Sequence, residues 1–452
     1  MDIATDTADA AMLHVGAEGS TLDMTQTILD IKEGTLAPTS INLAHHFIGS
    51  LVEKITAALE ENDSITALDL TCNNVGDVGA SRLAAMLRSS MILQVLLLRD
   101  NAIGPRGVKR LAEALRENDS LTTLDLSANL IDEAAGSLLA ASLETSATLL
   151  HLNLAFNGLR TQGARQLGVA LASGVPLQSL DLSHNMIAGD GCAFVSAGLR
   201  SNSSLQALNI SGNCIGDVGA QQLAAALSPN RTLRILRLAD NGIRKEGGGA
   251  LGLALTENFT ISELDLSRNY MWEDGAQVLS SAIGGNRTLQ CLSLASSGLR
   301  RQHVQPLFAA LEGNTALTDL DLAANSIEEV GVALLVATLH ANHTLRSLDL
   351  TFNNLRDLGA QYVAQGLEAN KGLTFLSLSD NHISEHGARK LAAALKAHNA
   401  VLQTLDLSLN GLSEQGNGDL AARLMMVGGQ LTLRHEPLRA KHAHFVNSSW
   451  HV

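Results

Sequence analysis

The stretch LTTLDLSANLI, residues 121–131, recurs along the chain. Residues 177–187 read LQSLDLSHNMI, residues 345–355 read LRSLDLTFNNL, and residues 402–412 read LQTLDLSLNGL. Self-similarity at a fixed period of about 20–50 residues is the sequence signature of a repeat architecture. The repeated unit, rather than any single motif, therefore decides the fold of this protein.

We set position 1 at the first apolar residue of the motif and follow it through the chain. Consecutive units lie 28 residues apart, with one additional residue before the last unit. Because one 28-residue motif recurs along most of the chain, the sequence argues against the three or so ordinary domains that 452 residues would suggest. The thirteen units begin at Ile65, Leu93, Leu121, Leu149, Leu177, Leu205, Leu233, Ile261, Leu289, Leu317, Leu345, Leu373 and Leu402.

The positions of the unit differ in their physical roles. Positions 4 and 6, such as Leu124 and Leu126, alternate as a short strand with one buried face requires. Position 9 is Asn in twelve of the thirteen units, for example Asn129, and its amide can satisfy backbone groups where the chain leaves the strand. Positions 19 and 23 are usually Leu, such as Leu83 and Leu87, which predicts one apolar face of a helix.

These residues resemble the leucine-rich repeat superfamily, and the 28-residue period with a full helix is similar to its ribonuclease-inhibitor subtype, as in the repeat domains of NOD-like receptors. The resemblance implies an α/β solenoid, a curved horseshoe with parallel strands on the concave face and helices on the convex face. Since one unit cannot bury its own leucines, stacked units must share one continuous core. The nucleotide-binding module that precedes the repeats in NOD-like receptors is not seen in this sequence.

The ends of the chain are expected to differ from the repeats. Residues 1–35 carry seven acids and one base, which predicts a disordered acidic segment. Residues 36–64 are expected to form an N-terminal cap, a degenerate unit before the thirteen repeats of 65–430. Residues 431–452 are expected to provide a last strand and a basic tail.

Composition and charge exclude several classes of function. The formal net charge of −14 disfavours binding to nucleic acid or to an acidic membrane surface. No run of 18 apolar residues and no signal or transit peptide is recognised, and four scattered cysteines indicate reduced thiols. These features favour a cytoplasmic protein, with a nuclear or cytoskeletal location also open.

No pattern typical of an enzyme or of a cofactor or metal site is present. The sequence has no phosphate-binding loop of the GxxxxGK[ST] type, no HExxH and no CxxC pair. His382 and His386 are four residues apart, but they lack the additional ligands that a metal site needs. We therefore expect no catalytic activity, no cofactor and no bound metal.

Seven Asn-x-Ser/Thr sequons follow the repeat period, with Asn at position 26 of the unit. In a secreted protein such sequons would be glycan acceptors. Their regular spacing and the lack of a recognised signal peptide favour a structural role instead, in which the Asn ends the helix before the next strand.

The strand positions predicted to face outward, numbers 2, 3, 5, 7 and 8, are acidic. Position 5 is Asp in seven of thirteen units, among them Asp265, Asp321 and Asp349. These positions together hold twelve acids and five Arg, which is about half of the net charge. One interpretation is a concave face that attracts a protein partner with a basic surface; the other is that Asp belongs to the consensus strand of the repeat.

The loops of units 7–9 depart from the repeat pattern. Tyr270 and Trp272 occupy positions 10 and 12 of unit 8, where most units have small or polar residues. Trp, Tyr and Arg are over-represented at binding hot spots, so we predict a partner-binding rim here, although burial of Trp272 against a helix is the alternative. The residues of this predicted site, with the acids of the concave face, are Arg237, Arg244, Asp265, Arg268, Tyr270, Trp272, Arg300, Asp321 and Asp349.

The sequence thus predicts a non-enzymatic protein–protein interaction module, a scaffold, sensor or inhibitor that binds a macromolecular partner through its acidic concave face and loop rim. Two alternatives remain open. One is a GTPase-activating protein that resembles the Ran GTPase activators, whose long acidic C-terminal tail is not found here. The other is a structural subunit of a cytoskeletal or ciliary assembly. The sequence does not indicate an oligomeric state.

Overall fold

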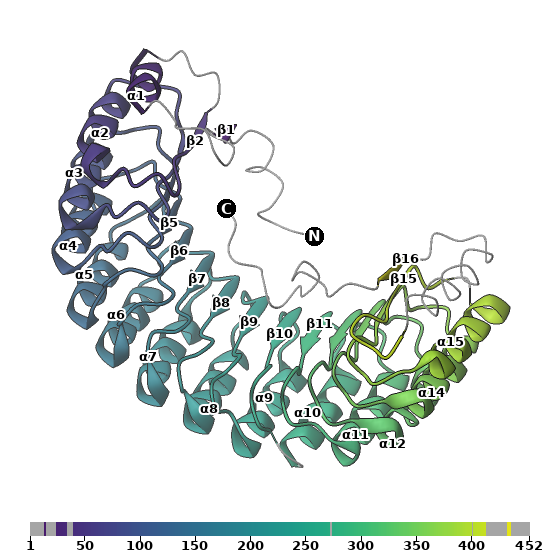
Figure 1. Cartoon of the computed structure of the whole chain (residues 1–452). Coiled ribbons are helices and arrows are strands. Elements are labelled where there is room, and N and C mark those ends of the chain that lie inside the picture. The colour runs from purple at the N-terminus through teal and green to yellow at the C-terminus, as the bar shows by residue number, and fades with distance from the viewer. Residues whose placement is uncertain are drawn as a thin grey trace. The chain divides into compact units, whose positions relative to one another are not determined.

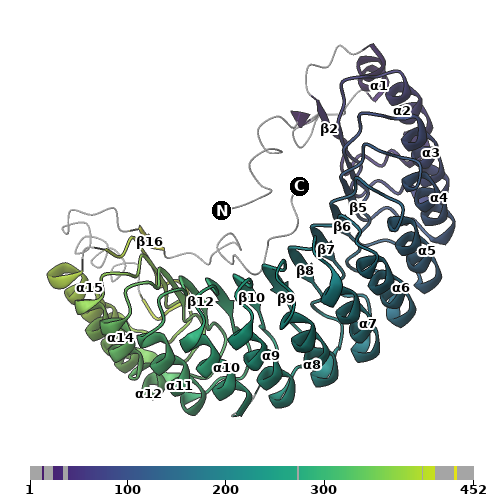
Figure 2. The ribbon, with the colours of Figure 1, turned by 180° about the vertical axis from the view of Figure 1, so that it is seen from behind.

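The computed structural model describes residues 13–14, 24–33, 39–271, 274–399, 401–412 and 432–434. The chain divides into two compact structural units, each made of several repeats, with the boundary between Cys214 and Ile215. From here on, first unit and second unit mean these two parts, and the 28-residue motifs are called repeats. In each unit, short parallel strands alternate with helices, and the helices lie on one side of the strands (Figures 1 and 2). The predicted α/β leucine-rich solenoid is therefore confirmed for the strands and helices.

The first unit contains eight of the described strands. Its elements are β1 (Leu13–His14), α1 (Met24–Glu33), β2 (Ser40–Asn42), the 3-10 helix η1 (Gly49–Leu51), α2 (Val52–Glu60), β3 (Ala67–Asp69), α3 (Gly76–Ser89), β4 (Val95–Leu97), α4 (Pro105–Leu115), β5 (Thr123–Asp125), α5 (Glu133–Leu143), β6 (His151–Asn153), α6 (Arg160–Ala172), β7 (Ser179–Asp181), α7 (Ala188–Ser201) and β8 (Ala207–Asn209). Neighbouring strands from β3 to β8 pair with a register of one repeat, as in Leu68 opposite Leu96.

The second unit continues the same alternation. Its elements are α8 (Gly216–Leu227), β9 (Ile235–Arg237), α9 (Lys245–Glu257), β10 (Glu263–Asp265), α10 (Asp274–Gly285), β11 (Cys291–Ser293), α11 (Arg301–Glu312), β12 (Asp319–Asp321), α12 (Glu328–Val332), α13 (Leu335–Ala341), β13 (Ser347–Asp349), α14 (Arg356–Ala369), β14 (Phe375–Ser377), α15 (Glu385–His398), β15 (Thr404–Asp406) and β16 (Thr432–Arg434). Every pair of neighbouring strands from β9 to β16 is parallel.

Leucines at fixed positions of the repeat form the core. Leu124 and Leu126, at positions 4 and 6 of their repeat, are 1% and 0% exposed, and Leu83 and Leu87 of α3 are wholly buried. Each strand from β3 to β15 leaves the sheet through a residue with left-handed backbone at position 8, such as His184 with φ 55°. This turn carries the chain onto a row of loops between strands and helices, which we call the loop rim. We call the sheet face opposite the helices the inner face.

The Asn at position 9 ties consecutive repeats together. Asn213 is wholly buried. Its Nδ2 donates to Leu182 O of the preceding repeat at 2.8 Å and to Ile210 O of its own repeat at 2.9 Å. Its Oδ1 accepts the N–H groups of Asn185 at 2.9 Å and Ile187 at 3.2 Å, both in the preceding repeat. The amide therefore satisfies backbone groups that the strand ladder leaves open.

We expect Asn213→Ala to lower the free energy of unfolding by about 1–3 kcal/mol, because buried backbone groups lose their partners. The matched change is His46→Ala, since His46 lies where the ladder Asn would be and its Nδ1 is 2.6 Å from Ala44 O. The side chain of His46 is only half-buried, so we expect a smaller loss there. Urea titration of both variants tests this, and equal losses would contradict the ladder role.

A second Asn ladder runs through position 26. Asn258 is wholly buried; its Nδ2 donates to Leu227 O at 2.9 Å and its Oδ1 accepts the N–H of Ile261 at 2.9 Å. The Asn side chains of the seven sequons at position 26 are all buried at 9% exposure or less: Asn62, Asn118, Asn202, Asn230, Asn258, Asn286 and Asn342. Glycan attachment to these side chains would require their removal from the core, so the structural interpretation of the sequons is confirmed.

A third device, which the sequence did not predict, is an Asp that binds the start of the next helix. Asp77 Oδ1 accepts the N–H groups of Gly104 and Gly107, both at 2.8 Å. Asp217 and Asp357 make the same kind of contact five and ten repeats further on. A Cβ on Gly107 would lie 2.9 Å from Asp77 Oδ1, which explains the Gly at position 15 of that repeat.

The N-terminal segment differs from the expectation for residues 1–35. Met24–Glu33 forms helix α1, and Ile31 in that helix is wholly buried. The Ile31 carbonyl accepts Nδ2 of Asn62 at 2.7 Å, so the position-26 ladder begins on α1. The acidic composition of the segment does not predict this helix. Thr27 and Ile31, four residues apart, nevertheless place two buried side chains on one face of it.

The proposed caps are described in part. Within residues 36–64, β2 pairs with β3 and is followed by η1 and α2, and the capping role of this segment remains a proposal. At the other end, β16 pairs with β15, with Leu433 opposite Leu405. The expected basic tail after residue 434 lies outside the described residues.

Candidate functional site

The predicted partner-binding rim lies in the second unit. Tyr270 is 52% exposed, and its N–H donates to Ile243 O at 2.9 Å, beside Arg244. Arg244 and Arg300 are exposed at the residues just before α9 and α11, and Arg268 is exposed at a position-8 turn with φ 56°. Trp272, the centre of this prediction, lies outside the described residues.

Arg237 of the predicted site is engaged within its own chain. Its Nε and Nη2 donate to Glu263 Oε1 at 3.1 and 2.8 Å, and the two side chains are only 13% and 21% exposed. Such a half-buried pair is worth more than an exposed one and fixes both side chains. Arg237 therefore orients Glu263 on the inner face rather than standing ready for a partner.

The Asp at position 5 is first of all a structural residue. Asp265 Oδ1 accepts the N–H of Ser267 at 2.9 Å, and Asp321 and Asp349 bind the N–H two residues on in the same way. Asp265 is buried, and burial raises the pKa of its carboxyl group. The consensus-strand interpretation of this Asp therefore has direct support, whereas half-buried Asp321 and Asp349 still present charge at the inner face.

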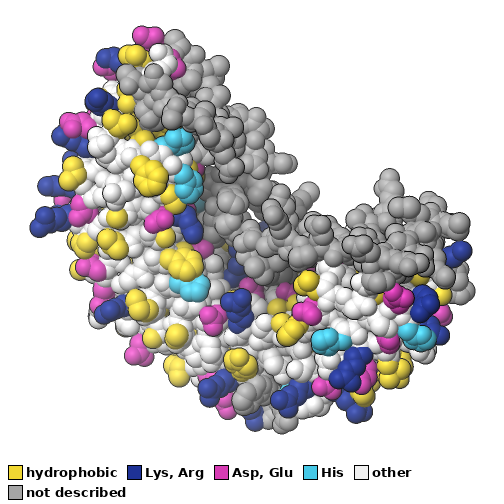
Figure 3. Space-filling model, in the orientation of Figure 1, with side chains coloured by type: hydrophobic (Ala, Val, Ile, Leu, Met, Phe, Trp, Pro, Cys, Tyr) yellow, Lys and Arg dark blue, Asp and Glu magenta, His cyan; other side chains and the backbone are white. Residues whose placement is uncertain are grey.

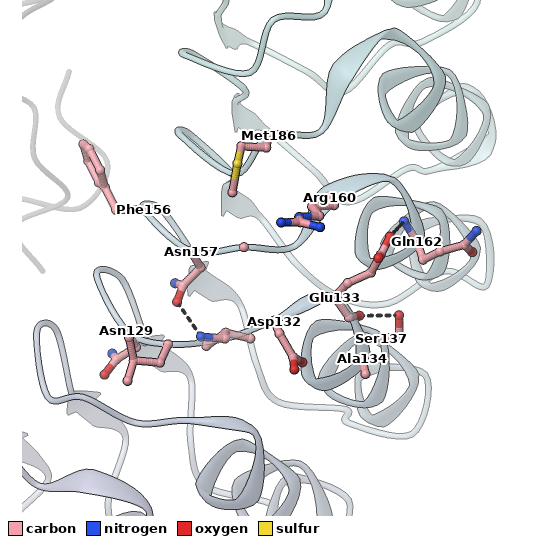
Figure 4. A pocket seen from close by; sticks show the side chains of 13 residues that line it. Asn129, Asp132, Glu133, Ala134, Ser137, Phe156, Asn157, Arg160, Gln162 and Met186 are labelled. Atoms are coloured by element: carbon pink, nitrogen blue, oxygen red, sulfur yellow. Dashed lines mark hydrogen bonds between the residues drawn. The ribbon is translucent and has the colours of Figure 1, made fainter.

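A groove in the loop rim of the first unit has no counterpart in the sequence-based prediction. It has a volume of about 880 Å³ and is formed by the β5–α5 and β6–α6 loops, the first turns of α5 and α6, and Met186. We call it the rim groove (Figure 4). Its lining residues are Asn129, Leu130, Ile131, Asp132, Glu133, Ala134, Ser137, Phe156, Asn157, Gly158, Arg160, Gln162 and Met186.

Three large apolar side chains lie at or beside the rim groove, and Phe156 among them points away from the other lining residues (Figure 4). Leu130, Phe156 and Met186 are 63%, 51% and 57% exposed. The Phe156 ring stacks on the His184 imidazole, with 4.3 Å between centroids and 14° between planes. Phe156 and Met186 have left-handed backbone, with φ 55° and 56°, which holds their side chains out on the rim. Figure 3 shows that apolar and histidine side chains lie side by side on the face it draws.

The other side of the rim groove is polar and fixed by its own hydrogen bonds. Asp132 caps α5 by accepting the N–H of Ala135 at 2.8 Å. Glu133 Oε1 accepts the N–H of Gln162 at 2.8 Å, which joins the starts of α5 and α6. Figure 4 shows Arg160 between this polar side and Met186. The groove therefore offers an apolar edge, two carboxylates and one guanidinium in a preformed arrangement.

The sequence contained a signal for the rim groove. Phe156 is a large apolar residue at position 8 of its repeat. Leu130 and Met186 are large apolar residues at position 10, the position that Tyr270 occupies in repeat 8. Their proximity could not be inferred, because left-handed residues at positions 8, 10 and 12 vary the path of each loop. The structure brings three neighbouring repeats together at this groove, whereas the rim predicted from the sequence lies around Tyr270, Trp272 and the nearby Arg residues.

Neither a metal site nor a membrane span is found in the part of the chain that the structure describes. No group of three or more His, Cys, Asp or Glu there is arranged to hold a metal ion. None of the described helices is long and apolar enough to cross a membrane.

Comparison with known proteins bears on the repeat itself. The model of the Leucine Rich repeat family matches residues 61–84, 145–168, 176–196, 201–224, 230–252, 341–364, 369–392 and 398–416. No curated protein matches the chain. Among solved structures, the leiomodin-1 actin-binding site 2 is similar over 30% of this chain and 82% of its own, with 22% identity and a TM-score of 0.28. With its 28-residue strand–helix units, the chain is a leucine-rich repeat protein of the ribonuclease-inhibitor-like type.

Proposed function

We propose that this protein is a non-enzymatic interaction module, a scaffold, sensor or inhibitor, that binds a protein partner through its loop rim and inner face. Leucine-rich repeat domains typically serve protein interaction, and the rim groove of the first unit supports this role most directly. The observation that carries the proposal is the exposure of Leu130, Phe156 and Met186 around a preformed groove.

The energetic argument rests on these three side chains. Full burial of an exposed Leu, Phe or Met side chain contributes about 1.5–3 kcal/mol, so covering each of these partly exposed side chains contributes roughly half of that. Isolated exposed apolar residues are ordinary, but three around one groove, rimmed by polar groups, are typical of an interaction site. Because hydrogen bonds already fix Asp132 and Glu133, little ordering is needed on binding, which favours affinity.

The rim of the second unit and the acidic inner face belong to the same proposal. Tyr270, Arg244, Arg268 and Arg300 would extend the contact in that unit. Asp265, Asp321 and Asp349 would favour a partner with a basic surface. The Tyr and the three Arg support the proposal by their exposure, and the three Asp support it by their charge.

We expect Phe156→Gly to weaken binding of the native partner by about tenfold, or about 1.4 kcal/mol, without unfolding the protein. The equivalent position of another repeat is Gly212, with φ 69°, so Gly fits this left-handed turn. The free energy of unfolding should change by no more than about 1 kcal/mol, the value of a stacked ring pair.

The test is photo-crosslinking in native lysate, with a photoreactive amino acid at Ala134 in the rim groove, with and without Phe156→Gly. Phe259 provides the matched control, because it is 58% exposed but lies between α9 and β10, on the side where chains enter the strands. A crosslinked partner that disappears with Phe156→Gly but persists with Phe259→Gly supports the proposal. Equal crosslinking in both variants would remove the rim groove as the binding site.

A further inference from the structure

The inner face of the second unit concentrates acids on neighbouring strands. Strand pairing places Glu263, Cys291 and Asp319 in one row and Asp265, Ser293, Asp321 and Asp349 in the next row. Adjacent strands are about 4.8 Å apart, so the carboxylates of Asp321 and Asp349 are direct neighbours. We call Glu263, Asp265, Asp319, Asp321, Asp349 and Asp406 the acidic patch.

Most of the patch uses only part of its hydrogen-bonding capacity within the protein. One oxygen of Asp321 accepts the N–H of Ala323 at 2.9 Å, and the other accepts Oγ of Ser293 at 2.9 Å. Asp319 Oδ2 accepts Oγ1 of Thr318 at 2.6 Å. A carboxylate offers about four acceptor sites, so capacity remains for donors from outside.

Asp406 of β15 extends the position-5 column and has an unused oxygen. Its Oδ1 accepts the N–H and Oγ of Ser408 at 2.9 and 2.6 Å. Its side chain is wholly buried, yet its Oδ2 has no hydrogen-bond partner among the residues that the structure describes. A buried carboxylate oxygen without a partner is costly, so this end of the column favours a positively charged donor.

Among the described side chains, the basic groups near the patch do not neutralise its centre, and Arg434 lies opposite Asp406 on β16 at its end. Arg237 is bound to Glu263, and Nη1 of Arg346 donates to Gly372 O at 2.8 Å. Arg234 and Arg268 are exposed on the same unit, at positions 2 and 8 of their repeats, outside the two rows. The patch thus keeps an excess of negative charge at its centre.

The like charges affect one another. Burial, and then the neighbouring Asp349, raise the pKa of Asp321 to about 6. Burial raises the pKa of Asp349 as well, with Asp406 nearby contributing. Burial and the acids Asp319 and Glu263 raise the pKa of the Cys291 thiol to about 12, so it stays neutral at the centre of the patch.

We propose that the acidic patch binds the Lys or Arg side chains of an extended segment of a protein partner, and that this binding weakens as the patch is protonated. The proposal rests on the protein-binding function proposed above and gives it a second contact of defined chemistry. Charge complementarity selects the occupant, because the patch carries carboxylates in rows and no described residues there form a metal site. Alternate side chains of an extended segment point to the same side, about 6.8 Å apart, and long basic side chains span the acidic rows.

The test is direct titration of the full chain with a fluorescent (Lys-Ser)4 peptide at low ionic strength, about 0.05 M. The Asp321→Asn/Asp349→Asn variant keeps the side-chain shape and removes two charges from the patch. Asp125→Asn/Asp181→Asn removes two charges from the same strand position in the first unit and is the matched control. We expect the patch variant to lose about tenfold or more in affinity and the control to stay within about twofold.

Acidity provides the second readout. With a pKa of about 6, only about a quarter of Asp321 is ionised at about pH 5.5, so wild-type affinity should fall about fourfold from pH 7.5. The patch variant should lose this pH dependence. Equal losses in both double variants would mean attraction to net charge alone and would overturn the proposal, as would the failure of the peptide to bind. Phe156→Gly should leave peptide binding unchanged, so a failed rim groove and a failed acidic patch are distinguishable.

Discussion

Gly198→Ala is expected to lower the free energy of unfolding by about 3 kcal/mol or more. Gly198 of α7 and Gly168 of α6 let the two helices approach until their backbones are in contact. A Cβ on Gly198 would overlap the carbonyl oxygen of Gly168, which cannot turn away as a side chain could. Overpacking a core typically costs about 1–3 kcal/mol, and a clash with backbone lies at the upper end of that range.

The matched control for Gly198→Ala is Gly249→Ala in α9. No atom lies within 4 Å of the position where a Cβ on Gly249 would be. Ala in a helix is more favourable than Gly by about 0.5–1 kcal/mol, so this variant should be more stable than the wild type. Urea titration of both variants measures the two effects. If they shift stability in the same direction, the helices of the first unit are not packed as closely as described.

Asp321→Asn is expected to stabilise the protein by about 2–3 kcal/mol at about pH 7.5. The pKa of Asp321 is raised from 3.8 to about 6 in the folded state, so the unfolded chain releases this proton more readily. The contribution of Asp321 to the free energy of unfolding therefore falls as pH rises from about 4 to about 6. Above that range the folded protein carries the full cost of holding the charged carboxylate. Each unit of pKa corresponds to about 1.36 kcal/mol. The variant avoids this penalty, and its advantage should vanish at about pH 4.

Asp357→Asn is the control with the opposite sign. Burial alone would raise the pKa of Asp357, but hydrogen bonds from Ser384 and Gly387 lower it overall. Its contribution is present above the unfolded value of 3.8 and is lost as pH falls through the lower folded value. The variant should lose up to about 1 kcal/mol at neutral pH, as for a weakened helix cap, and less in acid. Thermal unfolding across pH should give diverging curves for the two variants, and parallel curves would contradict both assignments.

The repeat made most of the fold predictable. A 28-residue period with Leu at positions 4, 6, 19 and 23 is sufficient to predict strand, helix and shared core, and the Asn at position 9 carries the ladder as expected. Helix α1 was not predictable from composition, because two buried side chains, Thr27 and Ile31, decide it within an acidic segment. The composition of a segment indicates only how polar it is on average, whereas one or two buried side chains are enough to hold a helix against the core.

The candidate site was less predictable than the fold. Asp265 and Asp321 both stand at position 5 and both accept the backbone N–H two residues on, yet Asp265 is buried whereas Asp321 is half-buried and faces the inner face. The rim groove depends on which neighbouring loops hold their side chains outward, and Leu130, Phe156 and Met186 come from three different repeats. Such proximity across repeats is set by backbone conformation, which the sequence period alone does not contain.

The direction of the Asn ladders has a consequence for synthesis on the ribosome. Asn101 donates to Leu70 O and accepts the N–H of Asn73, both in the repeat made before it. Asn118 likewise donates to Leu87 O of the earlier repeat. Each repeat, as it emerges, therefore supplies the groups that complete its predecessor and needs nothing from residues still to be translated for these contacts. The nascent chain can add its repeats one at a time in the order of translation, leaving only the newest one open.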